Sequence, residues 1–246
     1  MPLPFAIVLP GPATDVLGPV VQVPSRFADK VPAATGKLML TTVSISTPDA
    51  KVFGFEVLAR WIQADGVVVP KSVIYEPNVD VEEENRASLA EMDGSQDNAV
   101  AAAFNYLLKN EPDLVPYLKS GELNDQLVNF DLPNTGGPSG GLIFALAIIE
   151  KLNSAQLVSG RLIAGTGTIN KKGDVGPIGG IEDKLIGAKR AGATLFIAPI
   201  DNCIDITHIP KGLQIVAVST LAQAVTLLKK PVQALTQLPA LSGCSN

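Results

Sequence analysis

Apolar and polar residues follow one another along the chain in patterns that predict five strands. Residues 37–46 alternate in part and are rich in β-branched side chains. The short apolar segments 127–130, 162–169, 195–199 and 213–218 also have the length and composition of strands. Helical patterns separate several of these segments, which predicts mixed layers of helix and sheet.

The helical patterns differ in how buried they look. Residues 53–63 are amphipathic, whereas the unbroken apolar run 142–149 predicts a helix buried on all sides. Residues 184–191, followed by Gly192, and residues 221–228 are typical of short surface-packed helices.

Three further segments are assigned from their turn and breaker residues. Residues 81–108 predict two helices, because Asp93-Gly94-Ser95 interrupts the pattern and Ser95 would be a favourable N-cap for the second. Residues 109–125 are the most polar and least periodic stretch and predict a surface excursion. Residues 1–35 begin with a proline-rich apolar segment and are expected to form an extended arm.

Composition predicts one α+β domain over residues 1–246, with mixed sheets and packed helices. The chain is 46% hydrophobic and 17% charged, and 246 residues suffice for one sizeable core. A net charge of -5 argues against nucleic acid or an anionic membrane surface as the main partner, because both demand clustered Lys and Arg. No segment has the roughly 18 apolar residues of a membrane span, so we expect the chain as given to be soluble.

Few residues are suited to a metal or a nucleotide, and we expect neither a metal nor a cofactor. His208 is the only histidine and lies in a polar loop, which favours a surface position over a catalytic one. Cys203 and Cys244 lack metal-ligand spacing, and composition leaves open one disulfide or two free thiols. Lys71-Ser72 lack the second glycine of a P-loop, so no triphosphate site of that type is predicted.

The most informative segment is Gly-Gly-Pro-Ser-Gly-Gly at residues 136–141. Ser139 would lie at the start of the buried helix, where backbone amides and the helix dipole stabilise a developing oxyanion. A serine needs a base near neutral pH, and Lys184, 45 residues further on, can be that base once burial lowers its pKa. The residues expected to shape the substrate and oxyanion contacts are Gly137, Pro138 and Gly140. Alone the segment is a weak signal, since such turns also bind phosphate or are plain turns.

From residue 136 to residue 203 the sequence resembles the proteolytic domain of the Lon family, serine peptidases with a Ser-Lys dyad. The resemblance implies Ser139 as nucleophile, Lys184 as base and Thr166 as a hydroxyl that orients the lysine amine. Many Lon proteases have an aspartate where this chain has Gly136, which puts substrate preference and regulation in doubt. The matching motifs are Gly137-Pro138-Ser139, Thr166-Gly167, residues 177–181, Ala191-Gly192-Ala193 and residues 199–202.

The N-terminal half resembles the membrane-anchored, PDZ-containing Lon-like proteins of bacteria, over residues 5–17, 36–46 and 82–104. In that family a PDZ module precedes the strand before Gly-Pro-Ser, whereas here only residues 107–126 span the gap. The resemblance implies the outer face of a bacterial cytoplasmic membrane, with the anchor absent from this chain. Oxidation is permitted there, so we expect a Cys203–Cys244 disulfide.

Together these features predict an ATP-independent serine endopeptidase that cuts unfolded polypeptide segments through an acyl-enzyme, with a homo-oligomer left open. Two alternatives remain. One is an inactive Lon-like scaffold that binds peptides without cutting them. The other is a small-molecule kinase of a related two-layer fold, in which the glycine-rich helix start cradles phosphate.

Overall fold

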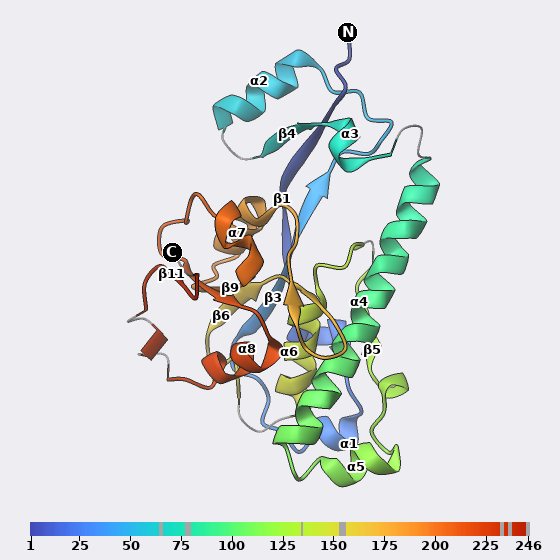
Figure 1. Ribbon diagram of the computed structural model, residues 1–246, viewed down its shortest axis with the longest axis vertical. Coiled ribbons are helices and arrows are strands. Elements are labelled where there is room, and N and C mark those ends of the chain that lie inside the picture. Colours follow the sequence, from blue (N-terminus) through green and yellow to red (C-terminus); the bar gives the residue numbers. More distant parts are fainter. Residues whose placement is uncertain are drawn as a thin grey trace.

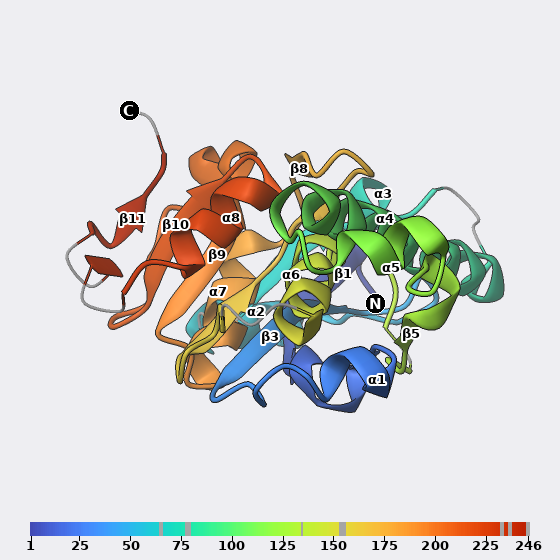
Figure 2. The same cartoon turned by 90° about the horizontal axis from the view of Figure 1, so that it is seen from below.

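The computed structural model describes residues 1–63, 66–76, 80–133, 135–152, 156–231, 234–235 and 238–244. At its centre is a seven-stranded sheet in the order β11-β10-β9-β6-β3-β1-β4. Helices cover both faces of this sheet (Figures 1 and 2). This is the α+β architecture that the sequence predicts.

The sheet is mixed. Strands β3, β6, β9, β10 and β11 run parallel to one another, and β1 runs antiparallel to both of its neighbours, β3 and β4. The strand bounds are β1 (Phe5–Asp15), β3 (Lys37–Ile45), β4 (Val67–Pro70), β6 (Leu162–Gly165), β9 (Leu195–Pro199), β10 (Gln214–Val218) and β11 (Leu241–Ser242). The strands predicted at residues 37–46, 195–199 and 213–218 are confirmed.

The predicted strand 162–169 is divided in two. After β6 the chain leaves the sheet at Thr166-Gly167, where Gly167 has φ +155°, and continues as β7 (Thr168–Ile169), which pairs with β8 (Val175–Gly176). A second small sheet pairs β2 (Val21–Gln22) with β5 (Asn129–Phe130), which lies in the predicted strand 127–130.

The helices form unequal layers. One face of the sheet carries α4 (Val81–Asn110), α6 (Gly141–Leu152) and α8 (Leu221–Leu228), and the other carries α7 (Ile181–Arg190) (Figures 1 and 2). The shorter helical segments are α1 (Ser25–Ala28), α2 (Gly54–Gln63), α3 (Lys71–Ile74), α5 (Val115–Ser120), the 3-10 turns η2 (Asp125–Leu127) and η3 (Ile200–Asp205), and the π-helical η1 (Val16–Val20).

Alternation along the strands divides the core between the two layers. Leu38 and Leu40 of β3 pack in the larger apolar cluster with α6, while Met39 between them packs in the smaller cluster with α7. Helix α6 is buried on every side through residues 141–150, as its unbroken apolar run predicts. The central sheet therefore holds α6 and α7 on opposite faces.

The prediction of two helices over residues 81–108 is wrong. Helix α4 is continuous for 30 residues, with Gly94 inside it, and Ser95 is a buried mid-helix residue rather than an N-cap. Buried residues on both sides of the glycine, Met92 and Ala99, pack against the core. This tertiary packing outweighs the helix-breaking tendency of one glycine, which is about 1 kcal/mol.

Residues 1–35 are extended at first but do not stand apart from the fold. Strand β1 lies inside the sheet, because Ala6 and Val8 are buried and the strand pairs along both edges. Residues 109–125 lie at the surface, yet some of their side chains pack against the rest of the fold. Leu123 is 1% exposed, and the ring of Tyr117 packs edge-on against Phe27 with centroids 5.2 Å apart.

The segment between β3 and α4 forms the end of the molecule near the N-terminus (Figure 1). Lys71 begins α3 there, and its amine donates hydrogen bonds to the carbonyls of Pro48 and Ala50, each at 2.6 Å. This lysine therefore serves the local fold. No helix of the described residues has both the length and the apolar character needed to cross a membrane.

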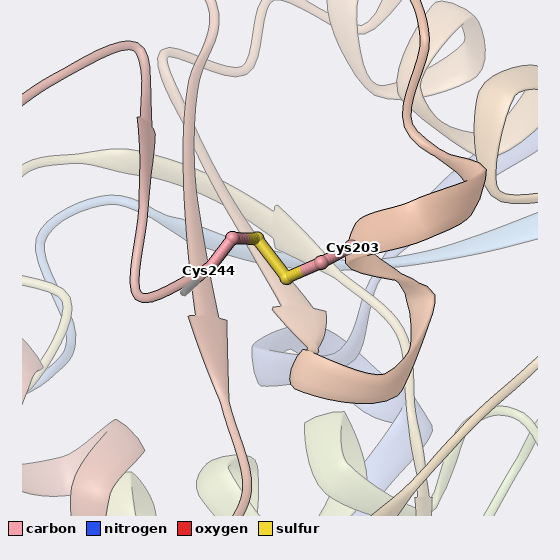
Figure 3. Close-up of a disulfide and its surroundings, with 2 residues drawn as sticks. All are labelled: Cys203 and Cys244. Carbon is pink, nitrogen blue, oxygen red and sulfur yellow. A yellow bond between two sulfur atoms is a disulfide. The ribbon is translucent and has the colours of Figure 1, made fainter. Parts of the chain in front are cut away.

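A disulfide joins Cys203 in η3 to Cys244 just after β11 (Figure 3). The predicted bridge is thus confirmed, with the two Cα atoms 5.8 Å apart and a sequence separation of 41. It fastens the C-terminal tail to the turn that follows β9.

Replacing both cysteines by serine should lower the free energy of unfolding, because the reduced chain loses the closure of a long loop. The loop-entropy account sets this loss at up to about 4 kcal/mol. Urea unfolding of the oxidised wild type and of the Cys203→Ser/Cys244→Ser variant measures it. Wild type treated with reductant should match the variant. Equal midpoints for all three proteins would contradict the expected role.

Candidate active site

The loop that carries Ser139 is tied to the end of β6 by reciprocal backbone hydrogen bonds. The Gly167 amide donates to the Ser139 carbonyl at 2.8 Å, and the Leu142 amide donates to the Gly167 carbonyl at 3.0 Å. Ser139 thus lies two residues before α6, held between that helix and the sheet.

Helix α4 holds the same loop from its other side. The Ser95 hydroxyl donates to the Pro138 carbonyl at 2.9 Å, and the Gly137 amide donates to the Ser88 carbonyl at 2.8 Å. Because the Gly137 amide is already used and proline has no N–H, neither residue can donate to an oxyanion in this arrangement. Their predicted contribution is restricted to shaping the loop.

Gly140 has a packing role beside its expected one. A Cβ at this position would lie 2.7 Å from the ring of Phe144, one turn into α6. The loop backbone at residue 140 can therefore approach α6 this closely only because glycine has no side chain. Of the three residues predicted to shape the oxyanion contacts, Gly140 alone keeps an amide that no other group is shown to occupy.

Lys184 reaches Ser139 from the opposite face of the sheet. It lies in the first turn of α7, and its Nζ is 2.8 Å from Ser139 Oγ and 3.0 Å from Thr166 Oγ1. The residue is 2% exposed. This burial disfavours the ammonium form and lowers the pKa of Lys184 to about 8.

Thr166 contacts both the Ser139 loop and the lysine amine. Its side chain is fully buried, its amide donates to the Ile197 carbonyl of β9, and its hydroxyl donates to the Ser139 carbonyl at 3.0 Å. With its proton used in this way, the Thr166 oxygen accepts a hydrogen from Lys184. The lysine amine is thus held between the Ser139 and Thr166 hydroxyl oxygens.

Ser139 and Lys184 line a cleft of about 870 Å³, and Thr166 lies buried behind them. One wall is formed by the far end of β3 and by β4, which lies beyond β1 in the sheet, and it is mainly apolar. The facing wall on α4 carries Glu84, Ser88 and Glu91. The pairing of β3 with β6 stops at Leu40, so residues 42–45 border the cleft with no strand of the described chain on that edge. An extended peptide backbone fits the hydrogen-bonding pattern of such an edge.

Gly136 lies where the structure leaves no room for a side chain. A Cβ at residue 136 would collide with the side chain of Ser88 on α4. The loop therefore approaches α4 more closely than a side chain would allow, which also brings the Gly137 amide to the Ser88 carbonyl.

Residues considered and set aside by sequence reasoning lie away from this site. The His208 side chain is 90% exposed and contacts Thr207 and Glu182, as its polar loop predicts. Among the described residues no three His, Cys, Asp or Glu side chains gather in a way that could hold a metal ion. Ser88 and Ser95 were missed as supports, because they bond to backbone groups far away in sequence, the Gly137 amide and the Pro138 carbonyl.

Comparison with known proteins agrees with this geometry. Residues 101–230 match the family model of the Lon protease (S16) C-terminal proteolytic domain, a range that includes Ser139, Thr166 and Lys184. Lon protease 1 of Bacillus subtilis is 45% identical over 78 residues, covering 32% of this chain and 10% of that protein. The Lon protease of Bacillus thuringiensis is 32% identical over 117 residues, covering 46% of this chain and 14% of that protein. The chain thus spans a small part of the length of these relatives.

The contact between Gly136 and Ser88 leads to a stability prediction. Gly136→Ala should destabilise the protein by about 1–3 kcal/mol through overpacking, and removing the opposing side chain in Ser88→Gly/Gly136→Ala should restore part of that loss. Thermal unfolding of both variants tests this. Gly94→Ala is the matched control, because a Cβ there meets nothing within 4 Å. A Gly136→Ala protein as stable as this control would show that the loop moves away freely.

Proposed function

Because the chain belongs to the family of Lon protease proteolytic domains, we propose that it is a serine endopeptidase in which Ser139 and Lys184 form the catalytic dyad. The observation that carries this proposal is the amine of Lys184, buried and within 2.8 Å of the Ser139 hydroxyl. A desolvated lysine beside a serine has the two properties that a general base needs, reach and a pKa near the working pH.

In the first half of the reaction, neutral Lys184 accepts the proton of Ser139 as the serine oxygen attacks the scissile carbonyl carbon. The Oγ–C bond forms, the carbonyl electrons move to oxygen, and Lys184 becomes an ammonium. Thr166 keeps the amine aligned throughout through its 3.0 Å contact. Collapse of the tetrahedral intermediate breaks the C–N bond, and the Lys184 proton passes to the leaving amine.

In the second half, Lys184 is neutral again and deprotonates a water molecule that attacks the acyl-enzyme ester. The ester C–O bond breaks, the proton returns to Ser139, and the acid product leaves. The oxyanion of both halves lies at the start of α6, where the helix dipole favours negative charge. We assign the amides of Ser139 and Gly140 as its donors, since Gly137 donates to Ser88.

The cleft supports unfolded polypeptide as the substrate. Residues 42–45 offer an open strand edge beside Ser139, and pairing along it requires that the substrate backbone be extended. Apolar side chains on the sheet wall, including Val43 and Val69, suit apolar residues of the substrate. We propose that cleavage needs no ATP, because a chain that arrives already unfolded needs no motor to extend it.

An extracytoplasmic setting is part of the proposal. The Cys203–Cys244 disulfide supports it, since such bridges persist in oxidising compartments and are rare in the cytoplasm. One experiment distinguishes an active peptidase from an inactive peptide-binding scaffold. A fluorophosphonate probe should label Ser139 of an active enzyme and leave a scaffold unlabelled.

Ser139→Ala and Lys184→Gln should each abolish hydrolysis of an unfolded casein substrate, and the double variant should be no worse than either, because the two residues act as a unit. Thr166→Val keeps the size of the side chain and should lower turnover by roughly 10- to 1,000-fold through misorientation of the amine. Initial rates with fluorescent casein measure all four. Activity above about a tenth of wild type in Lys184→Gln would show that another group is the base.

The pH dependence of kcat/KM should follow the neutral form of Lys184. Its pKa of about 8 means that activity rises about tenfold per pH unit below that value and levels off above it. A fluorogenic peptide assayed between about pH 6 and about pH 10 gives the profile. The exposed His208 provides the control, since His208→Ala should leave the profile unchanged. A midpoint that shifts or disappears in this variant would assign the titration to the histidine.

A further inference from the structure

The start of α7 determines where the Lys184 side chain lies. Residues 178–180, which lead into the helix, form its approach. The chain enters the helix through Gly179 and Gly180, and Gly180 adopts a left-handed conformation with φ +67°. A Cβ on Gly179 would meet nothing within 4 Å, whereas one on Gly180 would lie 2.9 Å from Val43. Ile178, just before them, packs against the smaller apolar cluster. Lys184 follows within one helical turn, with its amide bonded to the Gly180 carbonyl. Hydrogen bonds from a distant side chain to the backbone of this approach add to that packing.

Asn202 makes a two-point contact with the residue just before these glycines. The Ile178 amide donates to Asn202 Oδ1 at 3.0 Å, and Asn202 Nδ2 donates to the Ile178 carbonyl at 2.9 Å. The second hydrogen of the same nitrogen is donated to Asp205 Oδ2 at 2.9 Å. The side chain is 2% exposed, so the pairing takes place out of water, where a hydrogen bond is strong and a lost one is costly.

Asn202 itself is attached to the central sheet through β9. It lies in η3, which follows β9 directly, and the next residue, Cys203, is bonded to Cys244. Strand β9 also accepts the Thr166 amide at the Ile197 carbonyl, at 3.1 Å. Strand β9 therefore supports both Thr166, which bonds to the lysine amine, and the start of α7, which carries the lysine. It fixes Thr166 directly and the start of α7 through Asn202.

We infer that Asn202 is a positioning residue for the lysine base, holding the 178–180 approach so that Lys184 stays aligned with Ser139 and Thr166. This inference rests on the proposed function. A second contact from the same turn acts in the same direction, because Glu182 in the first turn of α7 accepts hydrogen bonds from the Thr207 amide at 2.8 Å and the His208 amide at 3.0 Å.

Asn202→Ala should lower kcat by roughly 10- to 100-fold while KM changes little, since the substrate cleft is untouched and only the base is displaced. It should also move the pH midpoint of kcat/KM upwards by about one unit or more, because a loosened Lys184 gains water and its pKa returns towards the ordinary value. The other titratable groups near the cleft and the η3 turn, Tyr75, Glu84, Glu91, Asp183 and Asp205, are unchanged in this variant.

Two further variants bracket the effect. Asp205→Ala removes one exposed support of the Asn202 amide and should produce a smaller shift in the same direction. Asp201→Ala alters an exposed neighbour on the same turn and should behave as wild type. If Asn202→Ala melts too low to be assayed, Asp205→Ala carries the test. A fall in kcat with an unmoved pH midpoint in both variants would mean that Asn202 is only structural, and would overturn the inference.

A readout without catalysis separates this inference from the proposed function. The rate at which acetic anhydride acetylates Lys184, followed by peptide mass spectrometry against pH, reports the pKa of the amine directly. The midpoint should be about 8 in wild type and higher in Asn202→Ala. An unlabelled, inactive wild-type Ser139 together with this shift would refute the protease and leave the positioning role intact. An active wild-type enzyme whose Lys184 acetylation midpoint does not change in Asn202→Ala would support the protease and refute the positioning role.

Discussion

The architecture is organised around keeping one lysine amine out of water. Lys184 is desolvated enough to lower its pKa to about 8, and its partners are two hydroxyl oxygens rather than a carboxylate that would raise that pKa again. Achieving this takes three elements from three layers, namely the loop before α6, the end of β6 in the sheet, and the first turn of α7. They meet where β6 stops and its neighbours continue, so the site lies at an interruption of the sheet rather than on its face.

Much of the fold follows from residue patterns that are strong on their own. The unbroken apolar run of α6 and the short β-branched strands β9 and β10 have no competing interpretation, and each forms as predicted. Helix α4 shows the opposite case, because only packing on both sides of Gly94 makes the helix continuous, and that packing is invisible in the local sequence. Strand β1 was harder for the same reason. Its prolines suggest an arm, while its pairing partners come from elsewhere in the chain.

For the site, the glycine-rich segment and the need for a base pointed to Ser139 and Lys184, and the resemblance to Lon peptidases strengthened these two and added Thr166. The structure brings these three side chains within hydrogen-bond distance. The residues that hold them could not be found in that way. Ser88, Ser95 and Asn202 act on backbone groups of residues at least 24 positions away, and no side-chain pattern records which carbonyl or amide a distant residue will meet. The degree of burial of Lys184 likewise depends on the assembled layers.

The position of the disulfide has a consequence for biosynthesis. Cys244 is made 41 residues after Cys203 and 60 residues after Lys184, as residue numbers 244 and 184 give. The bridge therefore cannot close until the ribosome has passed Cys244. Strand β11, which lies just before Cys244 and pairs with β10, is likewise made after α7. The turn that carries Asn202 therefore receives its covalent fastening only after the nucleophile and base exist and an oxidant has been met. Synthesis of the reactive groups and completion of their support are separate events in time.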